Sequence, residues 1–269
     1  MFAIEQFVPF AAIFSLAIFT QSATGFASGL VVIPLMVWAG HGIPEAQAAL
    51  LVSTLMQNGW GAYQYRETIQ FREVVPPASL RLVALPVGVG ALFMIDGFPT
   101  TLLRQIVGAV VVFCVLLLLI FRPKPKERVH PGWVWLAFPT SGFFQGCTGT
   151  GGPMMVLWVQ SHDWSTRRTR AFLFVMYLVT IVPAWLLLFY CFGTRMLEPS
   201  LAAIVIIPLL FAATWLGLRV GTWLGRHRLR SVTMGLLLVI GMTSIFSPML
   251  AQPIDHQDTE GPVEQPSNS

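Results

Sequence analysis

The stretch Thr20-Gln-Ser-Ala-Thr-Gly-Phe-Ala-Ser-Gly29 interrupts an apolar run that extends from about Phe7 to Trp38. A second stretch, Thr140-Ser-Gly-Phe-Phe-Gln-Gly-Cys-Thr-Gly-Thr-Gly-Gly-Pro153, interrupts another apolar run from about Gly132 to Val159. Glycine permits backbone conformations that a continuous helix lacks, and serine and threonine compete for backbone hydrogen bonds. Each stretch therefore predicts a helix that breaks inside an apolar segment.

The composition of the whole chain excludes an ordinary soluble protein. Of its 269 residues, 55% are hydrophobic and only 10% are charged, and the mean hydropathy is +0.71. Soluble domains carry about 25% charged residues. Apolar runs of about 20 residues, the length that crosses a bilayer as a helix, recur along the sequence. We therefore predict an all-α polytopic membrane protein.

The predicted elements have the same order in both halves of the chain. The first broken segment is followed by spans at about 45–62, 75–94 and 102–121, and the second by spans at about 169–189, 199–223 and 229–248. A few identities recur 127 residues apart, from Gly90, Leu102 and Gly108 to Gly217, Leu229 and Gly235. We predict two transmembrane repeats, residues 1–121 and 132–250, with a basic cytoplasmic linker at 122–131 and a disordered acidic tail at 251–269.

The length of the broken segments and the positions of the charges predict that the repeats are inverted. As one helix, residues 7–38 would extend about 48 Å, which exceeds the hydrocarbon core of about 30 Å. Each broken segment is therefore expected to enter and return, as a re-entrant or paired short helix. Each repeat then crosses an odd number of times, and both termini lie outside.

The positive-inside rule favours this inverted arrangement. With the linker in the cytoplasm, it places 13 basic residues inside and only Arg104 and Arg195 outside, whereas a parallel arrangement gives 8 against 7. The residues placed inside are Arg66, Arg72, Arg81, Arg122, Lys124, Lys126, Arg128, Arg167, Arg168, Arg170, Arg226, Arg228 and Arg230.

Enzymatic chemistry and nucleic-acid binding are not expected. A membrane enzyme places ionisable residues at membrane depth, whereas the five histidines fall in predicted loops or the tail. No catalytic group, metal site or cofactor can be assembled from the spans. The net charge of +4 comes from short basic clusters between spans. Arg219 alone is placed within a span; snorkelling towards the interface is favoured over a role as an anion counter-charge.

The two breaks together form the predicted binding site. Irregular backbone at membrane depth is tolerated where it is buried in protein or lines a cavity. A helix that begins after a break directs backbone N–H groups and a positive dipole end at that cavity, which suits an anion. Interrupted segments in two inverted halves predict a site near the midplane, although small residues also serve close helix packing. The predicted substrate-binding residues are Gln21, Ser22, Thr24, Ser28, Gly29, Gln57, Asn58, Gln145, Thr148, Gly149, Thr150, Gly151 and Gly152.

Gln57 and Asn58 belong to a polar set in the second span that also contains Ser53 and Thr54. These four residues recur at near-helical spacing. Two interpretations are equally supported: the set faces the predicted cavity, or it forms hydrogen bonds to neighbouring helices.

At these residues the sequence resembles the TauE/SafE family of sulfite and organosulfonate exporters. The resemblance covers about residues 7–246. It rests on Gly25-x-x-x-Gly29-x-x-x-x-Pro34, on Gly-x-Pro-x-Ala-Gln at Gly42–Gln47, and on Gly142-x-x-x-Gly146-x-x-Gly149-x-Gly151-Gly152-Pro153. The resemblance implies a bacterial inner-membrane permease for small sulfur-containing or carboxylate anions, with its translocation site at the glycine-rich segments. The first half departs from the pattern, because Ala27 and Ser28 stand where a denser glycine run is common.

These observations predict a secondary transporter, with export as the expected direction, that moves a small anion such as sulfite, an organosulfonate or a small carboxylate by alternating access. The sequence has no P-loop, so ion or substrate gradients would supply the energy, with a proton or sodium ion as the coupling ion. The expected partners are the anion and the lipid bilayer; a homodimer is left open. The alternatives are a passive anion channel or uniporter, and an accessory membrane subunit without transport.

Overall fold

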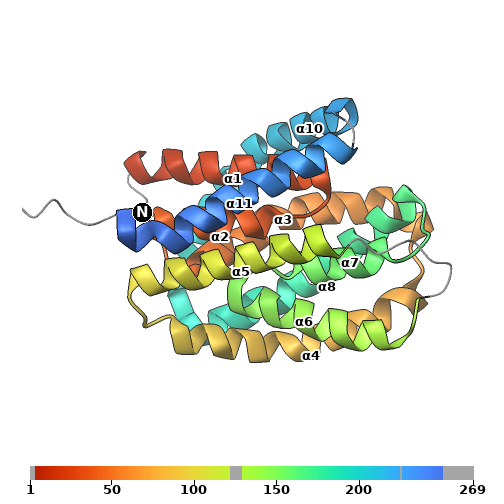
Figure 1. Ribbon diagram of the computed structural model, residues 1–269, viewed down its shortest axis with the longest axis horizontal. Coiled ribbons are helices and arrows are strands. Elements are labelled where there is room, and N and C mark those ends of the chain that lie inside the picture. The colour runs from red at the N-terminus through yellow and green to blue at the C-terminus, as the bar shows by residue number, and fades with distance from the viewer. Residues whose placement is uncertain (1–3, 122–128, 225, 251–269) are drawn as a thin grey trace, which may run out of the picture.

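The protein is described by a computed structural model that covers residues 4–121, 129–224 and 226–250 (Figure 1). All secondary structure in these residues is helical. Residues 122–128 of the predicted linker and the whole predicted tail lie outside them. The helices are α1 (Ile4–Thr24), α2 (Ser28–Trp38), α3 (Ile43–Gln64), α4 (Phe71–Ile95), α5 (Thr100–Ile120), α6 (Gly132–Thr148), α7 (Gly152–Gln160), α8 (Thr166–Phe192), α9 (Leu197–Val205), α10 (Ile207–Leu224) and α11 (Arg226–Leu250), with 3-10 turns η1 (Arg66–Thr68) and η2 (Gly193–Met196).

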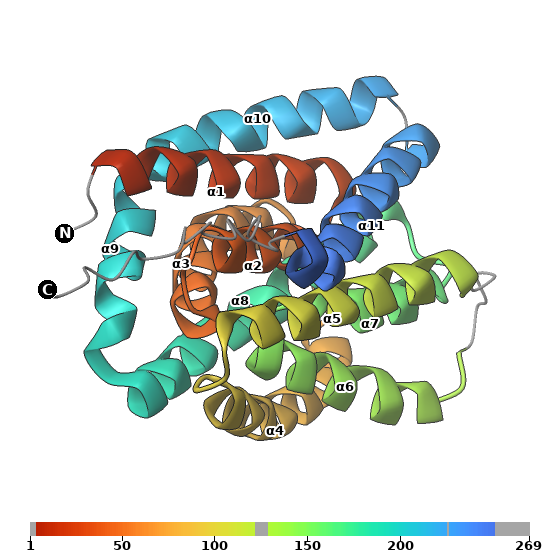
Figure 2. The same cartoon turned by 60° about the vertical axis from the view of Figure 1, so that its left-hand side comes forward.

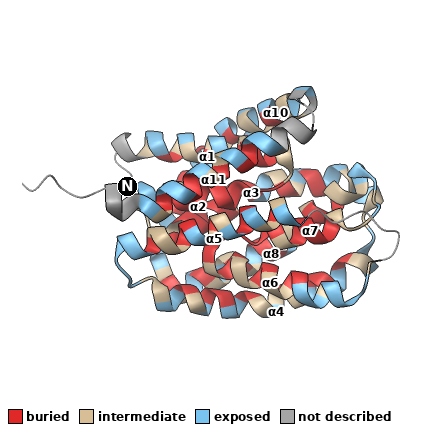
Figure 3. Cartoon of the chain, viewed as in Figure 1, coloured by how far each residue is buried: buried red, intermediate tan, exposed pale blue. Residues whose placement is uncertain are grey.

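Several helices have the length and apolarity of membrane spans, which confirms the predicted all-helical membrane architecture. Within the described residues, four helical stretches are long and apolar enough to cross a membrane: Phe7–Thr24, Phe71–Ile95, Thr100–Ile120 and Thr166–Val205. Shorter apolar helices cover Ser28–Trp38, Ile207–Gly221 and Ser231–Phe246. Many large apolar side chains of these helices are exposed, as expected for a surface that contacts lipid. Figure 3 shows where the exposed residues lie along the helices.

The helix α3 is long enough to span but is too polar to belong to this group. It has 22 residues, and it carries Gln47, Ser53, Thr54, Gln57 and Asn58. All of these except Gln57 are buried. Polar side chains at membrane depth face protein or a water-filled cavity rather than lipid. The polar face of α3 therefore points into the bundle.

Two closely packed helix pairs form opposite sides of the bundle (Figure 2). α4 packs along α6 on one side, and α1 packs along α10 on the other. Glycines allow both approaches: Gly142 and Gly146 of α6 face the α4 backbone, and Gly217 of α10 faces the α1 backbone at Phe19. α2, α3, α5, α7 and α8 lie between the two pairs (Figure 2).

Two ion-pair groups mark the two ends of the bundle. Arg195, just after α8, contacts Glu45 at the start of α3 and Asp96 at the end of α4. Arg168, at the start of α8, contacts Glu73 at the start of α4. We call these the Arg195 end and the Arg168 end. The contacts mean that α3 runs from the Arg195 end to the Arg168 end, whereas α4 and α8 run in the reverse direction.

The predicted span at 199–223 is two helices rather than one. α9 ends at Val205 and α10 begins at Ile207. Pro208 occupies the first turn of α10, where its fixed φ is suitable and its missing N–H leaves no helical bond unmade. In the interior of a continuous helix the same proline would remove a hydrogen bond and clash with the preceding turn.

Candidate functional site

The first broken segment separates α1 from α2 through residues 25–27. Gly25 and Ala27 both have positive φ, 88° and 90°. Ala27 is the one residue other than glycine with positive φ in the described chain, and such a conformation costs an L-residue about 1–2 kcal/mol. The Thr24 hydroxyl lies within hydrogen-bond distance of the carbonyl oxygens of Thr20 and Phe26, at 2.8 and 2.7 Å. The Thr24 hydroxyl therefore supplies a hydrogen-bond donor for backbone carbonyl groups at the end of α1.

The second broken segment separates α6 from α7 through residues 149–151. Gly149 ends α6 with a φ of 67°, and its N–H donates to the Gln145 carbonyl at 3.1 Å. Gly151 has an ordinary φ of −64°, but a Cβ at this position would clash with the carbonyl oxygen of Ser141. Pro153 lies in the first turn of α7, a position that proline favours.

The two breaks meet at one small cavity. A Cβ on Gly29 would overlap the carbonyl oxygen of Gly149, so the first turn of α2 touches the end of α6. The cavity has a volume of about 40 Å³, which is enough to hold ordered water or one small anion. Predicted site residues that line it are Gln21, Ser28, Gly29, Asn58, Gln145, Gly149, Thr150 and Gly152.

The polar groups of this cavity are suited to a hydrogen-bonding ligand. The side-chain oxygens of Gln21 and Asn58 are buried and have no hydrogen-bond partner. The Thr150 hydroxyl pairs with the Thr148 hydroxyl at 2.6 Å. A Cβ on Gly152 would lie 2.7 Å from the Tyr177 hydroxyl, and Tyr177 lines the cavity as well. Buried polar atoms normally find partners, so these groups mark the cavity as a place where a polar ligand is accommodated.

A second and much larger cavity continues from the small one towards the Arg168 end. It has a volume of about 570 Å³ and shares Gln21, Asn58 and Tyr177 with the small cavity. The predicted residues Ser22 and Gln57 line it, joined by a bond from Gln57 Nε2 to the Ser22 hydroxyl at 2.8 Å. Its other lining residues are mostly apolar and come mainly from α3, α8 and α10, with Ile18 and Gly25 from the first broken segment. Near the Arg168 end they include Gln64, Tyr65 and Arg170.

Three predicted site residues do not line either cavity. They are Thr24, Thr148 and Gly151. Thr24 and Thr148 direct their hydroxyls at neighbouring backbone carbonyls, and Gly151 provides space against Ser141 and Gln145. These three residues therefore support the backbone of the two breaks without lining the cavities. The polar set of the second span is divided: Thr54 and Asn58 line the small cavity, and Ser53, Gln57 and Asn58 line the large one.

The position of Arg81 differs from two predictions. We predicted that Arg81 lies among the basic residues on the inside, and that Arg219 is the one basic residue within a span. Arg81 is instead the eleventh residue of α4, and its relative exposure is 0%. It lies about 15 Å along the helix from its first residue. Close contact between its backbone and Gly142 of α6 buries it. Arg219, in contrast, is exposed and stacks on Trp215, 4.0 Å from the ring centroid.

The Arg81 guanidinium lies directly behind the small cavity. Nη2 donates to Gln145 Oε1 at 3.1 Å, and Nη1 lies 3.4 Å from Met155 Sδ. The guanidinium carbon lies 5.4 Å from the centroid of the Tyr177 ring. Gln145 and Tyr177 both line the cavity. Arg81 was not among the predicted site residues, although its place as the seventh residue of the predicted 75–94 span was a usable signal.

Gln47 is a further contact that sequence reasoning missed. Its Nε2 donates to the carbonyl oxygens of Gln145 and Gly146, and its relative exposure is 0%. It therefore ties α3 to the end of α6, where helix carbonyls need donors. The Gln in Gly-x-Pro-x-Ala-Gln, which begins at Gly42, was a weak signal, because an isolated polar residue near a span end has many explanations.

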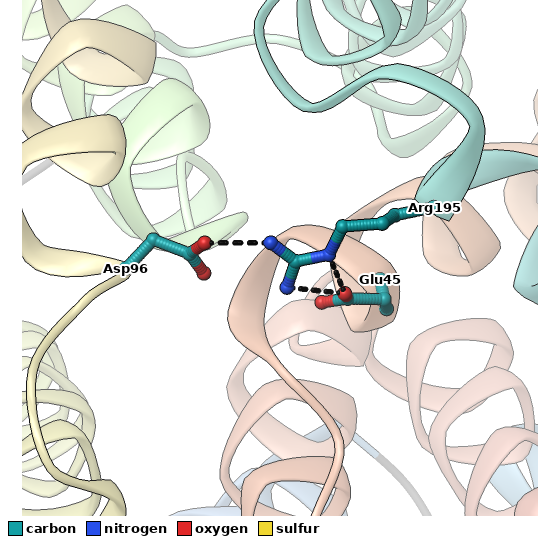
Figure 4. Close-up of polar contacts among 3 residues, drawn as sticks. All are labelled: Glu45, Asp96 and Arg195. Atoms are coloured by element: carbon teal, nitrogen blue, oxygen red, sulfur yellow. Dashed lines mark hydrogen bonds and ion pairs between the residues drawn. The ribbon is translucent and has the colours of Figure 1, made fainter.

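The ion-pair group at the Arg195 end joins three separate segments (Figure 4). The Arg195 guanidinium donates to Glu45 Oε1 at 2.8 Å and to Asp96 Oδ2 at 2.9 Å. Both carboxylates are largely shielded, with side-chain exposures of 18% and 17%, whereas Arg195 is 53% exposed. A network that is partly shielded from solvent holds its segments together better than isolated surface pairs do. This group fastens η2 to the ends of α3 and α4.

Apolar spans, two helix breaks and a shared polar cavity define a polytopic membrane transporter. The family model described as "Sulfite exporter TauE/SafE" matches residues 10–243. The chain belongs to this family, and it is therefore a multi-pass membrane transporter and not an enzyme. The predicted resemblance is confirmed.

A curated relative supports the same assignment. The chain is 26% identical over 240 residues to a protein named "Probable sulfite/organosulfonate exporter TauE" from Cupriavidus necator. The aligned region covers 86% of this chain and 90% of the relative. No solved structure matches the chain significantly.

Proposed function

We propose that the protein is a secondary transporter that moves a small anion by alternating access, with export as its direction. The candidate substrates are sulfite, an organosulfonate or a small carboxylate. The observation that carries this proposal is the meeting of both helix breaks at one polar cavity, lined by Ser28 and Gly29 on one side and by Gly149 and Gly152 on the other. The name of the curated relative supports the sulfur-containing candidates.

Backbone N–H groups are the proposed primary ligands. The first residues of α2 and α7, Ser28 and Gly152, both line the cavity. The first turn of a helix has N–H groups without intrahelical acceptors and a positive dipole end, which together favour an anion. Gly29 and Gly152 allow close approach because they have no side chain. The Thr150 hydroxyl and the amides of Gln21, Asn58 and Gln145 supply further polar contacts.

Helix contacts and directions support an inverted repeat that forms this site. An inverted repeat would match α1, α2 and α3 with α6, α7 and α8, and α4 with α10. Under this match the helix pair α4–α6 corresponds to the pair α10–α1, and both pairs are closely packed. α3 and α8 run in opposite directions, as inversion requires. The identities 127 residues apart join α4 to α10 and α5 to α11.

The charge distribution supports a cytoplasmic Arg168 end and outside termini. When the buried Arg81 is left out, the number of basic residues placed inside falls from 13 to 12, against two placed outside. In this orientation Arg66, Arg72, Arg167, Arg168 and Arg170 lie on the cytoplasmic side, whereas Arg104 and Arg195 lie outside. The positive-inside rule holds for short loops near span ends, which these residues occupy. The membrane is proposed to be the bacterial inner membrane.

The conformation is proposed to be the one that is accessible from the cytoplasm. The large cavity reaches Tyr65 and Arg170 at the Arg168 end, whereas Arg195 fastens Glu45 to Asp96 at the opposite end. Alternating access requires this second end to open, so breaking the Arg195 pairs is expected to favour the outward-open state. Labelling of a cysteine placed near Ser200 by a membrane-impermeant maleimide, in a cysteine-free chain, is expected to increase in Arg195→Gln.

Reconstituted vesicles test the proposed function. Protein in proteoliposomes is expected to exchange internal for external sulfite or methanesulfonate and to accumulate the anion when a proton or sodium gradient is imposed. Flux that only dissipates the anion gradient would support a passive channel or uniporter instead. No flux and no anion binding by protein that remains folded would leave the accessory-subunit interpretation. A homodimer and the identity of the coupling ion stay predictions, and mass measurement and ion replacement test them.

A further inference from the structure

Arg81 is a buried charge without an acidic partner in the described parts of the chain. The acidic residues whose side chains the structure describes, Glu45, Glu67, Glu73, Asp96, Asp163 and Glu198, all lie at helix ends or in connections. The contacts of Arg81 are instead an amide oxygen, a thioether sulfur and an aromatic ring, and its Nε has no hydrogen-bond partner. A buried cation that lacks a counter-charge is destabilising, so a protein that retains one derives a use from it.

The geometry connects this charge to the small cavity through Gln145. A guanidinium has five N–H donors and no acceptor, so the Gln145 amide must present its oxygen to Arg81. The amide nitrogen, with its two N–H donors, is then the end left for the cavity that Gln145 lines. Gln47 holds the backbone carbonyl of the same residue. Arg81 thus sets the orientation of an amide that donates to a ligand.

The aromatic contact places the charge near the cavity as well. Tyr177 lines the cavity, and its ring centroid is 5.4 Å from the guanidinium carbon of Arg81. In a site with few polar neighbours, a charge acts over several ångströms more strongly than it would in water. The cavity therefore experiences a positive potential even though no charged side chain lines it.

We propose that Arg81 is the residue that makes the cavity select anions over neutral molecules of the same shape. It acts as a positioning residue, because it orients the Gln145 amide, and as a fixed positive charge behind the site. The inference rests on the proposed anion site. It adds that the substrate is bound as an anion whose charge offsets the charge of Arg81.

Two probes of nearly equal shape separate charge from size. Methanesulfonate is an anion, and dimethyl sulfone is its neutral counterpart. Wild-type protein in detergent is expected to bind methanesulfonate at least about tenfold more tightly than dimethyl sulfone. The affinities are measured from the rise of the thermal unfolding midpoint with ligand concentration. Arg81→Lys keeps the charge but not the planar fork, so it is expected to bind more weakly and to keep the preference. Arg81→Gln is expected to lose the preference.

Arg219→Gln is the matched control, because Arg219 is exposed and lines neither cavity, although the Trp215 ring on which it stacks borders the large one. Its affinity and preference are expected to equal those of the wild type. An unchanged preference in Arg81→Gln overturns the inference and leaves the proposed function standing. Failure of the folded wild type to bind methanesulfonate or sulfite removes the proposed anion site itself.

A second variant keeps the inference testable if Arg81→Gln does not fold. Gln145→Glu places a carboxylate where Arg81 already donates to Oε1. The internal ion pair is expected to raise the thermal midpoint without ligand and to abolish stabilisation by methanesulfonate. Gln145→Glu protein that still binds methanesulfonate as tightly as wild type would contradict the proposed role of the Arg81 charge.

Discussion

The two helix breaks occupy the same place in their segments, and each contains a glycine that is required for a different reason. At the first break, Gly25 has a φ of 88° and a Cβ there would meet nothing within 4 Å. At the second, Gly151 has a φ of −64°, which any residue adopts, but a Cβ there would lie 2.8 Å from Gln145 Cβ. At Gly25 the limit is therefore backbone conformation, whereas at Gly151 it is space.

The glutamine side chains beside the two breaks differ in how firmly they are held. Gln145 beside the second break is held by Arg81 and Gln47, whereas Gln21 beside the first has a side-chain oxygen without a partner. Gln21 also borders the large cavity. A related backbone pattern therefore forms a fixed platform in one half and a more adaptable surface in the other, where the larger cavity begins.

The largest expected effect comes from replacing one glycine at each break with a larger residue. Gly151→Ala should destabilise the protein by about 3 kcal/mol, because the added methyl meets backbone that cannot move away easily. Gly25→Asn should change stability by less than about 1 kcal/mol, because asparagine tolerates the left-handed region. Thermal unfolding in detergent measures both. Similar losses at the two positions would remove the distinction between conformation and space.

Removing one amide at each break should give unequal results. Gln145→Met leaves a buried guanidinium without its acceptor and should cost about 2 kcal/mol. Gln21→Met removes a polar atom that has no partner, so stability should stay within about 0.5 kcal/mol of wild type, while methanesulfonate binding weakens. The same unfolding assay compares them. A large loss of stability in Gln21→Met would show that Gln21 has a structural role that its contacts do not reveal.

Ala27 offers a smaller change of opposite sign. Ala27→Gly should relieve about 1–2 kcal/mol of backbone strain and lose about 0.8 kcal/mol from a buried methyl group, for a net gain of roughly 0.5 kcal/mol. Ala49→Gly, in the interior of α3, should instead cost about 1 kcal/mol or more. Paired unfolding midpoints test the sign, and destabilisation by Ala27→Gly would count against strain at the first break.

The smallest expected effect concerns the loops that follow the two half-helices. Burial lowers the pKa of His41 after α2, against the raising effect of Glu45. Burial also lowers the pKa of His162 after α7, where Arg168 acts in the same direction and the Trp158 carbonyl and Glu73 oppose it.

Because the folded state binds fewer protons at these histidines than the unfolded state, their contribution to stability is present above about pH 6.5 and decreases below it. His162→Phe keeps the ring beside Trp158, 4.2 Å away between centroids in the native pair, and should flatten the decline of the thermal midpoint between pH 7.5 and 5.5. An unchanged decline would assign it to other groups.

The sequence was sufficient for the local features of the fold. Glycine at Gly25 and Gly149 and proline at Pro153 predicted both helix breaks close to where they lie, because those residues determine backbone conformation locally. The predicted spans also agree with the helices except at Ile206, where the effect of Pro208 was not recognised.

The arrangement of the site could not be obtained in the same way. Arg81 becomes a buried charge only because Gly142 lets α6 approach the α4 backbone, and that contact joins residues about 60 positions apart. Likewise, Thr24 and Thr150 have similar chemistry, but only Thr150 lines the cavity, because the Thr24 hydroxyl turns to nearby carbonyls. Local sequence does not determine which hydroxyl is used by the backbone.

The polarity of α3 has a consequence for how the protein reaches its membrane. Amides such as Gln47 and Asn58 weaken recognition of this segment by the insertion machinery, which responds to hydrophobicity summed over a helix. Its long-range partner α8 is made about 100 residues later. We therefore expect α3 to integrate stably only after the second half has been synthesised. In an arrested nascent chain that ends before Thr166, a cysteine placed at Ala49, which is buried in the full chain, should react with a water-soluble maleimide that does not label it in the full-length protein.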